Sequence, residues 1–517
     1  MKIYKTLAMA AVLASGMTLT SCGDSFLESK PTEALADGGT ATEASINSGL
    51  AATYQILLFD SYANNNYESV CVVADVQSDD CYKGGGDAAD QLQLYYFSQF
   101  KADGLHTLPG SWNIYTSGFA RANSVINACK VAEQTDKVKR YNAEAHFLRA
   151  YYVYMLWKYF GNIVFFEEPL TNDTKYTAPQ ITPDEAYAQI ISDLTVATEE
   201  GVLPMTTNGD PTGDGNGRVS RAAALMLKAR VVMYQNDKSR YDDVANDLAT
   251  IINSGSYDLL EDFNAIWDND GEFCVESIFE ANHMGEGKTW ASGWGGYGTN
   301  LPAFISPNGL NDPSGVYHDG WGFCPVRVST YDMFAQGDTR RDASINDFRT
   351  VGSYGPRFQD TGLFFKKYAA RVGYRKPVGD QDLNYCNNLR IFRFAETLLN
   401  YAELVLMDGV SEKQGVSAKT CFNRVRRRAF GDTNHDIANP TAKDIKNEYH
   451  YEFVGEGHRY YDLVRWGDAA TVLTESADDL RPGRTWQSFN KYMPVPQDEI
   501  DKTLGTPYEL KQNPGYN

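Results

Sequence analysis

The sequence has no excess of positive charge. It carries 67 aspartates and glutamates against 47 lysines and arginines, which gives a formal net charge of −20. Such an acidic chain would repel the phosphates of nucleic acid and the headgroups of an anionic lipid surface. We therefore expect no nucleic-acid partner, and any attachment to a membrane must be covalent or made through another protein.

The signature motifs of common enzyme classes are also absent. The sequence contains no HExxH zinc motif, no GxSxG nucleophile elbow and no phosphate-binding P-loop. A glycoside hydrolase would need two carboxylates on either side of a sugar. Adjacent acids such as Glu167 and Glu168 say nothing about that geometry. We expect a protein that is not an enzyme and has no cofactor, with glycoside hydrolysis as an unfavoured alternative.

Patterns for disulfides and metals are weak. Seven cysteines follow the first one, an odd and scattered set without a CxxC pair, which suits neither a disulfide framework nor zinc. Cys71 and Cys81 bracket one segment and either pair or stay free. Asp210, Asp214 and Asn216 offer oxygen ligands for calcium, but their spacing does not match the twelve-residue calcium loop. We expect no metal site.

The N-terminus has the features of an export signal. Two lysines precede a mostly apolar run, Leu7 to Leu19, which is too short for a spanning helix, so residues 1–21 are predicted to be a signal peptide. The run ends in Leu-Thr-Ser-Cys-Gly, which resembles the bacterial lipobox, where cleavage precedes the cysteine and its thiol is lipidated. We predict lipidation of Cys22 and a polar tether over residues 22–45. An ordinary signal peptide with an incidental cysteine is the alternative.

The stretch from Tyr141 to Phe166 organises the rest of the chain. Its spacing predicts a helix with one continuous apolar stripe, stopped by Gly161. Glu144 and Arg149 are too polar for that stripe, so we expect them to hold loops or adjoining helices. Small residues between the aromatic ones let neighbouring helices approach closely, which is typical of scaffold. The stripe consists of Tyr141, Ala145, Leu148, Tyr152, Leu156 and Tyr159.

Helical patterns recur on both sides of a glycine-rich and aromatic-rich segment. Residues 218–235 and 241–253 predict a helical hairpin of the tetratricopeptide type, although no strict 34-residue period is present. We expect an N-terminal part over 46–270 and a C-terminal part over 271–517, the two forming one compact unit. The C-terminal part is loop-rich over 271–384, helical over 385–470 and irregular in its tail. Further helices are expected over 45–59, 112–133, 182–200, 391–407, 421–429 and 444–453, and residues 70–80 begin in a strand-like manner.

Seven segments that follow one another along the chain carry a family resemblance: Cys22, 143–161, 217–234, 391–404, 422–430, 449–467 and 492–517. Together they resemble the SusD/RagB family of outer-membrane nutrient-binding lipoproteins. The resemblance implies an all-α fold, an α-α superhelix in which four tetratricopeptide-like helix pairs pack against a loop-rich, irregular part. It also implies an outer-membrane lipoprotein at the cell surface that captures an oligosaccharide and delivers it to a SusC-like TonB-dependent transporter. A peptide-binding or purely assembling lid of such a transporter is the alternative.

The family pattern does not carry a ligand site, so candidates come from chemistry. Sugars are recognised by flat aromatic faces and convergent polar groups, and exposed aromatics among glycines suit an interface. The alternative is that these aromatics fold the loops onto the body. Three groups qualify: Trp290, Trp294 and Tyr297; Tyr317, Trp321 and Phe323; and Tyr82 with Asp79, Asp80 and Lys83.

A charged cluster near the C-terminus is interpreted as structural. Its opposite charges stand at helical spacing and, if they are buried, must be paired. His146 and His458 are expected to be hydrogen-bonded scaffold residues. The cluster consists of Glu448, Glu452, Glu456, Arg459, Asp462 and Arg465.

Overall fold

The computed structural model describes residues 41–61, 68–168, 170, 174, 176–209, 215–475, 478 and 480–516. The expected signal peptide, Cys22 and the calcium candidates Asp210 and Asp214 lie outside these residues. The helices of the N-terminal half are α3 (Glu43–Tyr54), α4 (Val70–Gln77), α5 (Leu92–Ser98), α6 (Pro109–Val131), α7 (Asp136–Phe160), α8 (Pro183–Ala197), α9 (Arg221–Gln235) and α10 (Tyr241–Asn253).

The C-terminal half contains further helices and most of the short strands. The helices are α11 (Leu301–Ile305), α12 (Val328–Asp332), α13 (Arg340–Ser344), α14 (Phe394–Leu406), α15 (Ala418–Phe430), α16 (Ala442–Phe453), α17 (Arg459–Trp466), α18 (Ala469–Val472) and α19 (Gln497–Thr503). Three two-stranded antiparallel sheets pair β1 (Ile163–Val164) with β2 (Gln180–Ile181), β3 (Ser277–Ala281) with β6 (Leu389–Arg393), and β4 (Ile345–Asp347) with β5 (Leu363–Phe365).

Helix α7 is the central helix, as the sequence predicts, but it is not amphipathic. The Thr135 hydroxyl accepts a hydrogen bond from Val138 N at the start, and Gly161 ends the helix with a φ of 67°. Every residue from Ala143 to Phe160 except His146 is buried. A helix that is apolar all round is enclosed by its neighbours, so the expectation of one apolar stripe is too narrow.

The two polar residues in α7 hold its neighbours, as expected. Glu144 accepts hydrogen bonds from the Tyr54 hydroxyl at 2.6 Å and from Arg218 at 2.9 Å. Arg149 contacts Asp193 of α8 with its closest N–O distance at 2.6 Å, and also Asn123 of α6 at 2.9 Å. Because buried charges need partners, these contacts set how α6, α7 and α8 pack together.

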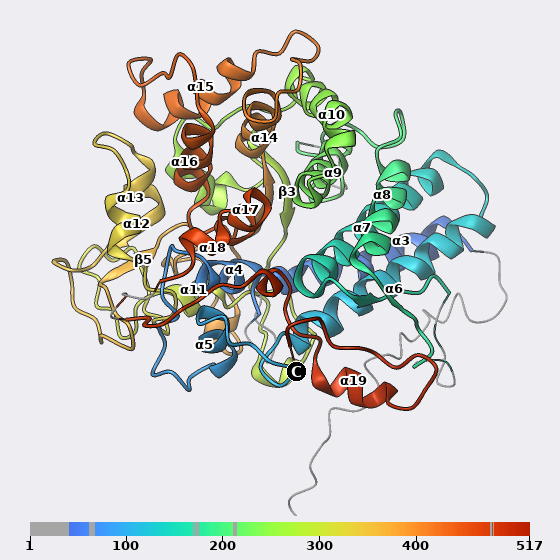
Figure 1. Cartoon of the computed structure of the whole chain (residues 1–517), viewed down its shortest axis with the longest axis horizontal. Coiled ribbons are helices and arrows are strands. Elements are labelled where there is room, and N and C mark those ends of the chain that lie inside the picture. The colour runs from blue at the N-terminus through green and yellow to red at the C-terminus, as the bar shows by residue number, and fades with distance from the viewer. Residues whose placement is uncertain are drawn as a thin grey trace, which may run out of the picture.

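Successive helices pack side by side into a curved stack (Figure 1). Helix α3 contacts α6 and α7, α7 contacts α8, and the order continues through α8–α9, α9–α10, α10–α14 and α14–α15. Consecutive partners α6–α7, α9–α10, α14–α15 and α16–α17 provide the four expected helix pairs. This arrangement is the α-α superhelix that the sequence predicts. No helix among the described residues is long and apolar enough to cross a membrane.

Two segments differ from the sequence prediction. Residues 70–77 form helix α4 rather than a strand, and residues 389–393 form strand β6 before helix α14 begins at Phe394. Valines favour strands only weakly, and the surroundings decide. In α4, every residue from Cys71 to Gln77 is buried, so burial on all sides overrides the local preference. Cys71 and Cys81 are both buried and free.

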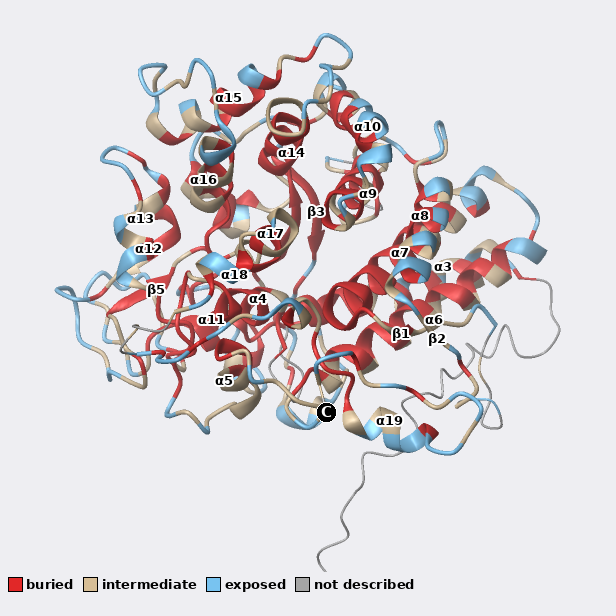
Figure 2. Ribbon diagram, viewed as in Figure 1, coloured by how far each residue is buried: buried red, intermediate tan, exposed pale blue. Residues whose placement is uncertain are grey.

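The interior is shared by the helical stack and the loop-rich part. Buried residues run from α7 through α4, α17 and β3 into the loops near α11 (Figure 2). The helical stack and the loop-rich part therefore have one continuous core.

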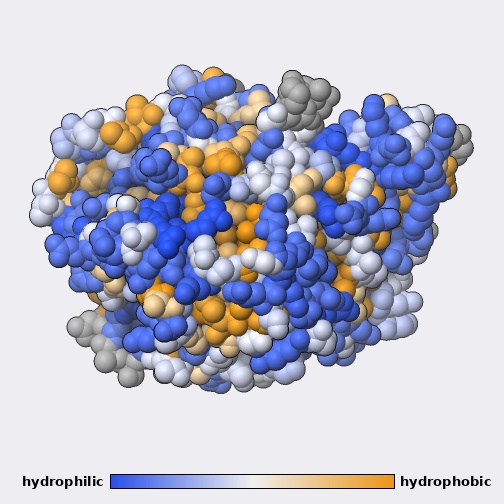
Figure 3. Space-filling view, turned by 90° about the horizontal axis from the view of Figure 1, so that it is seen from above, coloured by the Kyte–Doolittle hydropathy of each residue, from blue (hydrophilic) through white to orange (hydrophobic). Residues whose placement is uncertain are grey.

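The face above α10 and α15 is largely hydrophilic, with apolar residues in separate patches (Figure 3).

The C-terminal charged cluster is buried and paired, as predicted, but mostly with partners distant in the sequence. Arg393 contacts Glu276 at 2.6 Å, Glu452 at 3.1 Å and Glu456 at 2.8 Å. Arg428 contacts the same Glu452 at 2.5 Å. These pairs join β3, β6, α15 and α16, so their charges connect segments rather than turns of one helix. The remaining pairs are Glu448 with Arg340 and Arg426, Glu452 with Arg340, Glu456 with Lys367, Arg459 with Asp79, Arg465 with Glu403, and Asp462 with Arg465.

Candidate functional site

Two tryptophans from the loop-rich part lie face to face at the surface. The rings of Trp290 and Trp321 are 6.0 Å apart between centroids and inclined by 29°. Trp290 is 50% exposed and Trp321 is half-buried. We call this pair the tryptophan platform. Since 31 residues separate the two in sequence, only the folding of the loops brings them together.

The platform is supported from beneath by phenylalanines. The Trp321 ring meets Phe304 of α11 edge-on at 5.9 Å, and Phe304 stacks on Phe323 at 4.0 Å. The backbone N–H of Trp321 donates to the Ala303 carbonyl at 2.7 Å. Phe323 is only 3% exposed, so this candidate supports the site from within rather than contacting a ligand.

Polar groups surround the platform. The Trp321 indole N–H donates to Asp382 at 3.1 Å, and Arg375 contacts the other oxygen of Asp382 at 2.6 Å. The backbone N–H of Trp290 donates to the Asp380 carboxylate at 2.8 Å. Burial, aided by Arg375, lowers the pKa of His318 from its usual value, which favours the neutral ring at pH 7. The surroundings therefore offer both donors and acceptors.

The remaining loop candidates do not join the platform. Trp294 packs on Phe59 at 5.0 Å between centroids, and Tyr317 meets Phe348 edge-on at 6.3 Å. Tyr297 is 45% exposed and lines a separate groove beside α3. The structure thus brings together Trp290 and Trp321 and leaves the other aromatics elsewhere.

The N-terminal candidates are occupied by interactions within the protein. Asp79 forms a two-bond ion pair with Arg459 at 2.8 and 3.0 Å, and the buried Asp80 contacts His450 at 2.5 Å. The hydroxyl of the buried Tyr82 donates to Asp478 at 3.1 Å. These three residues hold the loop after α4 against the C-terminal segment, and the structure gives them no open face.

Lys83 is buried with its neighbours. Its ammonium donates to the Asp87 carbonyl at 2.7 Å and lies 5.1 Å from the centroid of the Phe323 ring. Asp80, Tyr82 and Lys83 are thus all buried, and a role of this loop in ligand binding stays a prediction. Among the described residues, Asp79, Asp80 and His450 form one group close enough to hold a metal ion. Arg459 and the Asp80–His450 contact already satisfy most of those atoms.

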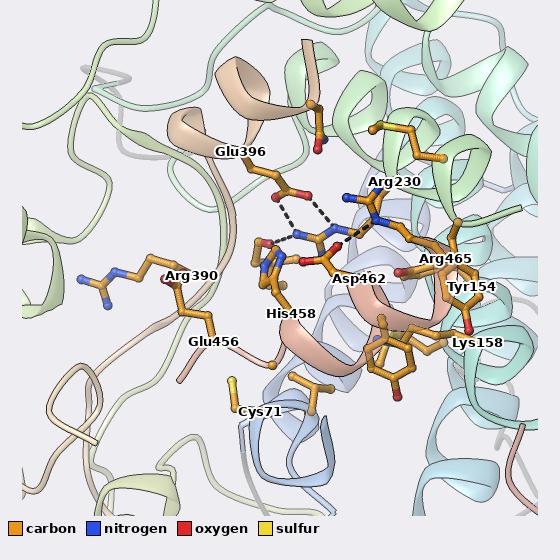
Figure 4. A pocket seen from close by; sticks show the side chains of 18 of the residues that line it. Cys71, Tyr154, Lys158, Arg230, Arg390, Glu396, Glu456, His458, Asp462 and Arg465 are labelled. Carbon is orange, nitrogen blue, oxygen red and sulfur yellow. Dashed lines mark hydrogen bonds and ion pairs between the residues drawn. The ribbon is translucent and has the colours of Figure 1, made fainter. Parts of the chain in front are cut away.

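An interior cavity of about 80 Å³ lies between α7, α9, α14 and α17 (Figure 4). Arg230 contacts Glu396 at 2.6 Å on one side, and the Lys158 ammonium lies over three tyrosine rings on another. His458 stacks on Phe453 with ring centroids 4.4 Å apart. A space of this size holds a few water molecules. We interpret the cavity as part of the folded scaffold.

Comparison with known proteins shows the family. Residues 276–516 match the model described as the SusD family, and residues 25–233 match the model described as starch-binding associating with outer membrane. The chain belongs to the SusD family. The curated SusD-like protein P2 from Formosa agariphila is 24% identical over the full length of both chains.

Solved structures give nearer relatives. The surface glycan-binding protein A from Bacteroides fluxus is 62% identical, with a TM-score of 0.88 over 92% of this chain and 100% of that one. The corresponding protein from Bacteroides thetaiotaomicron, solved in complex with laminarihexaose, is 36% identical. Its TM-score is 0.83 over 91% of this chain and 99% of that one.

The polar residues around the tryptophan platform could not be predicted from the sequence. Asp380, Asp382 and Arg375 are ordinary loop residues about 55 to 90 positions from the tryptophans that they contact or surround. No local motif marks them. Only the paired backbone of the loops places them beside the rings, for example through the hydrogen bond from Asp380 N to the Lys288 carbonyl at 2.9 Å.

Proposed function

We propose that this chain is a non-catalytic glycan-binding lipoprotein of the outer-membrane surface, and that its ligand is an oligosaccharide of the laminarin type. The observation that carries the proposal is the tryptophan platform with its polar surround. Support comes from two relatives, one named as a surface glycan-binding protein and one solved with laminarihexaose.

The platform has the chemistry that a sugar ring requires. A pyranose presents a flat C–H face that packs on an indole, while its hydroxyls need hydrogen-bonding partners around the edge. Trp290 and Trp321 provide the faces, and Asp382 and Arg375 provide the acceptors and donors. Each stacked ring is worth about 0.5–1.5 kcal/mol beyond the buried area. Binding is therefore modest and reversible, which suits a protein that releases its ligand.

Attachment and delivery complete the proposal. The lipid on Cys22 anchors the chain, and the polar segment between Cys22 and helix α3 acts as a tether that lets the folded part reach ligand outside the membrane. The partner is a SusC-like TonB-dependent transporter, which receives the captured oligosaccharide. The lipobox at Cys22 and the family membership support this arrangement.

The test is affinity electrophoresis in gels containing laminarin or other polysaccharides, followed by calorimetry with laminarihexaose. Trp290→Ala is the safest variant because this side chain is half exposed. We expect a loss of affinity of about 2- to 13-fold, which corresponds to one stacked ring. Tyr508→Ala, at another exposed aromatic, is the control and is expected to bind like the wild type.

Trp321→Ala should lose more glycan affinity than Trp290→Ala, because the Trp321 ring also positions Trp290 and Asp382. Its folding is checked by circular dichroism. If the wild type binds no glycan in the panel, the carbohydrate assignment is wrong, and a peptide ligand or a purely assembling role becomes the better hypothesis. If it binds but both tryptophan variants bind equally well, the site lies elsewhere.

A further inference from the structure

A second groove lies where the end of helix α3 meets the loop after β3. Tyr54, Leu57 and Leu58 line it from the helix end, and Asn282 and Tyr297 line it from the loop. The groove has a volume of about 360 Å³, within the range of small-molecule pockets, about 300–1,000 Å³. We call it the Tyr297 groove.

Hydrogen-bonding groups in the groove are available to a ligand. Neither the Tyr297 hydroxyl nor the Gln55 amide makes a hydrogen bond with any described residue. Asn282 is exposed, and among the described residues its side chain makes one long hydrogen bond, in which its oxygen accepts from the Asn388 amide at 3.4 Å. A Cβ at Gly217 would lie 2.0 Å from the Asn282 amide nitrogen, so a glycine there makes room for this side chain. The groove thus combines an exposed ring with an unused hydroxyl and two amides.

Two residues that line the groove, Tyr54 and Glu280, are fixed by hydrogen bonds to neighbouring residues of the protein. The Tyr54 hydroxyl donates to Glu144 at 2.6 Å and accepts from Val219 N at 2.9 Å, which fixes its ring. Glu280 accepts from Phe273 N at 3.0 Å and from Asn388 at 2.9 Å. This buried carboxylate also lies 3.7 Å from the Arg390 guanidinium, so its charge is balanced within the protein and the groove offers no free charge. A charged ligand finds no counter-ion here, whereas a neutral polyhydroxylated one finds both a ring face and hydrogen-bonding groups.

We propose that the Tyr297 groove is a second glycan subsite, which holds one or two sugar residues of the same polysaccharide that the tryptophan platform binds. This inference rests on the proposed function. Neither platform tryptophan lines the groove, so the two sites are separate. Tyr297 stacks on the sugar ring, and the Gln55 and Asn282 amides bind its hydroxyls.

Two sites on one chain affect long and short ligands differently. A polysaccharide that occupies one site presents its other residues to the second at a high effective concentration, so its retention exceeds the affinity of either site. An oligosaccharide at the platform that is too short to reach the groove gains nothing from it. The groove therefore governs retention of polymer and leaves the platform's affinity for short oligosaccharides unchanged.

The test uses two variants that alter the groove in opposite ways. Tyr297→Ala removes the ring, and Ala51→Trp fills the groove from an exposed position on α3. Tyr508→Ala is again the matched control. We expect both groove variants to lose about fivefold or more in retention by laminarin in affinity gels, with laminarihexaose affinity by calorimetry unchanged. The control is expected to keep both properties.

The outcomes separate this inference from the proposed function. If laminarin retention is lost in Trp290→Ala and intact in both groove variants, the second subsite is refuted and the platform stands. If Tyr297→Ala weakens laminarihexaose binding as much as laminarin retention, Tyr297 belongs to the platform and the separate subsite is refuted. If the wild type is not retained by any polysaccharide, the proposed function fails and the subsite fails with it.

Discussion

Lys158 presents a buried positive charge whose removal should stabilise the protein. Its ammonium lies 4.4 Å from the ring centroid of Tyr461, 5.1 Å from that of Tyr159 and 5.3 Å from that of Tyr154. No described residue accepts a hydrogen bond from it. Burial, and then the charge of Arg230, lowers the pKa of Lys158 from 10.5 to about 7. We therefore consider Lys158→Met, which keeps the length of the side chain and removes the charge.

The magnitude follows from proton linkage. Between pH 7 and 10.5 Lys158 is protonated in the unfolded chain but only partly protonated in the folded protein. The free energy of unfolding therefore falls as the pH decreases through that window. At pH 7 Lys158 lowers the free energy of unfolding by about 4 kcal/mol. The methionine gives up the ring contacts, worth about 1–2 kcal/mol. We expect Lys158→Met to be more stable by about 2–3 kcal/mol at pH 7, with the advantage shrinking towards pH 10.

The measurement is urea unfolding of wild type and variant at pH 7, 8.5 and 10, compared at each pH so that other titrating groups cancel. Lys137→Met on the same helix is the control, because this lysine side chain is 72% exposed. The control is expected within about 0.5 kcal/mol of the wild type at each pH. A Lys158→Met protein that is less stable at pH 7, or whose difference from the wild type does not change with pH, would refute the reasoning.

Three further variants test the scaffold by thermal or urea unfolding. Glu452→Gln removes a buried negative charge that Arg393 and Arg428 share and should cost about 3–5 kcal/mol, and a loss below 1 kcal/mol would show that their remaining carboxylate partners suffice. Gly84→Ala places a Cβ 2.5 Å from the Gly322 carbonyl oxygen at a φ of 70° and should destabilise by more than about 1 kcal/mol. Gly373→Ala, with a similar φ and open space, separates the steric from the backbone effect. Thr182→Ala removes the capping box of α8 and should cost about 1 kcal/mol, and an unchanged midpoint would mean that tertiary packing alone holds this end.

The sequence predicted the long helices well because their signals are local. Thr182, Pro183 and Glu185 mark the start of α8 by chemistry that acts within one turn, and the structure places the helix there. Helices α9 and α10 begin and end close to the predicted positions for the same reason. Their apolar spacing is long enough for a helical period to stand out.

The predictions that failed depend on tertiary surroundings. The valines of α4 predict a strand, but in the structure they are buried by residues far away in the sequence. The burial of Tyr82 and Lys83 could not be predicted either, because Asp478 and Phe323 contact them from the other half of the chain. At the platform, Trp321 could be proposed from its glycine-rich context. Its partner Asp382 could not, since only long-range folding brings the two together.

The tail after α18 has a consequence for how the protein is made. Arg481 and Arg484, both fully buried, donate hydrogen bonds to backbone carbonyls of Ser78 at 3.3 and 3.1 Å, across about 400 residues of sequence. Contacts between residues so far apart in the sequence form late in folding, because the chain between them must become compact first. The turn after α4 therefore gains its partners only once nearly all of the polypeptide has been synthesised. Until that last segment arrives, the carbonyl of Ser78 lacks these two partners and the turn after α4 is expected to be accessible to proteases.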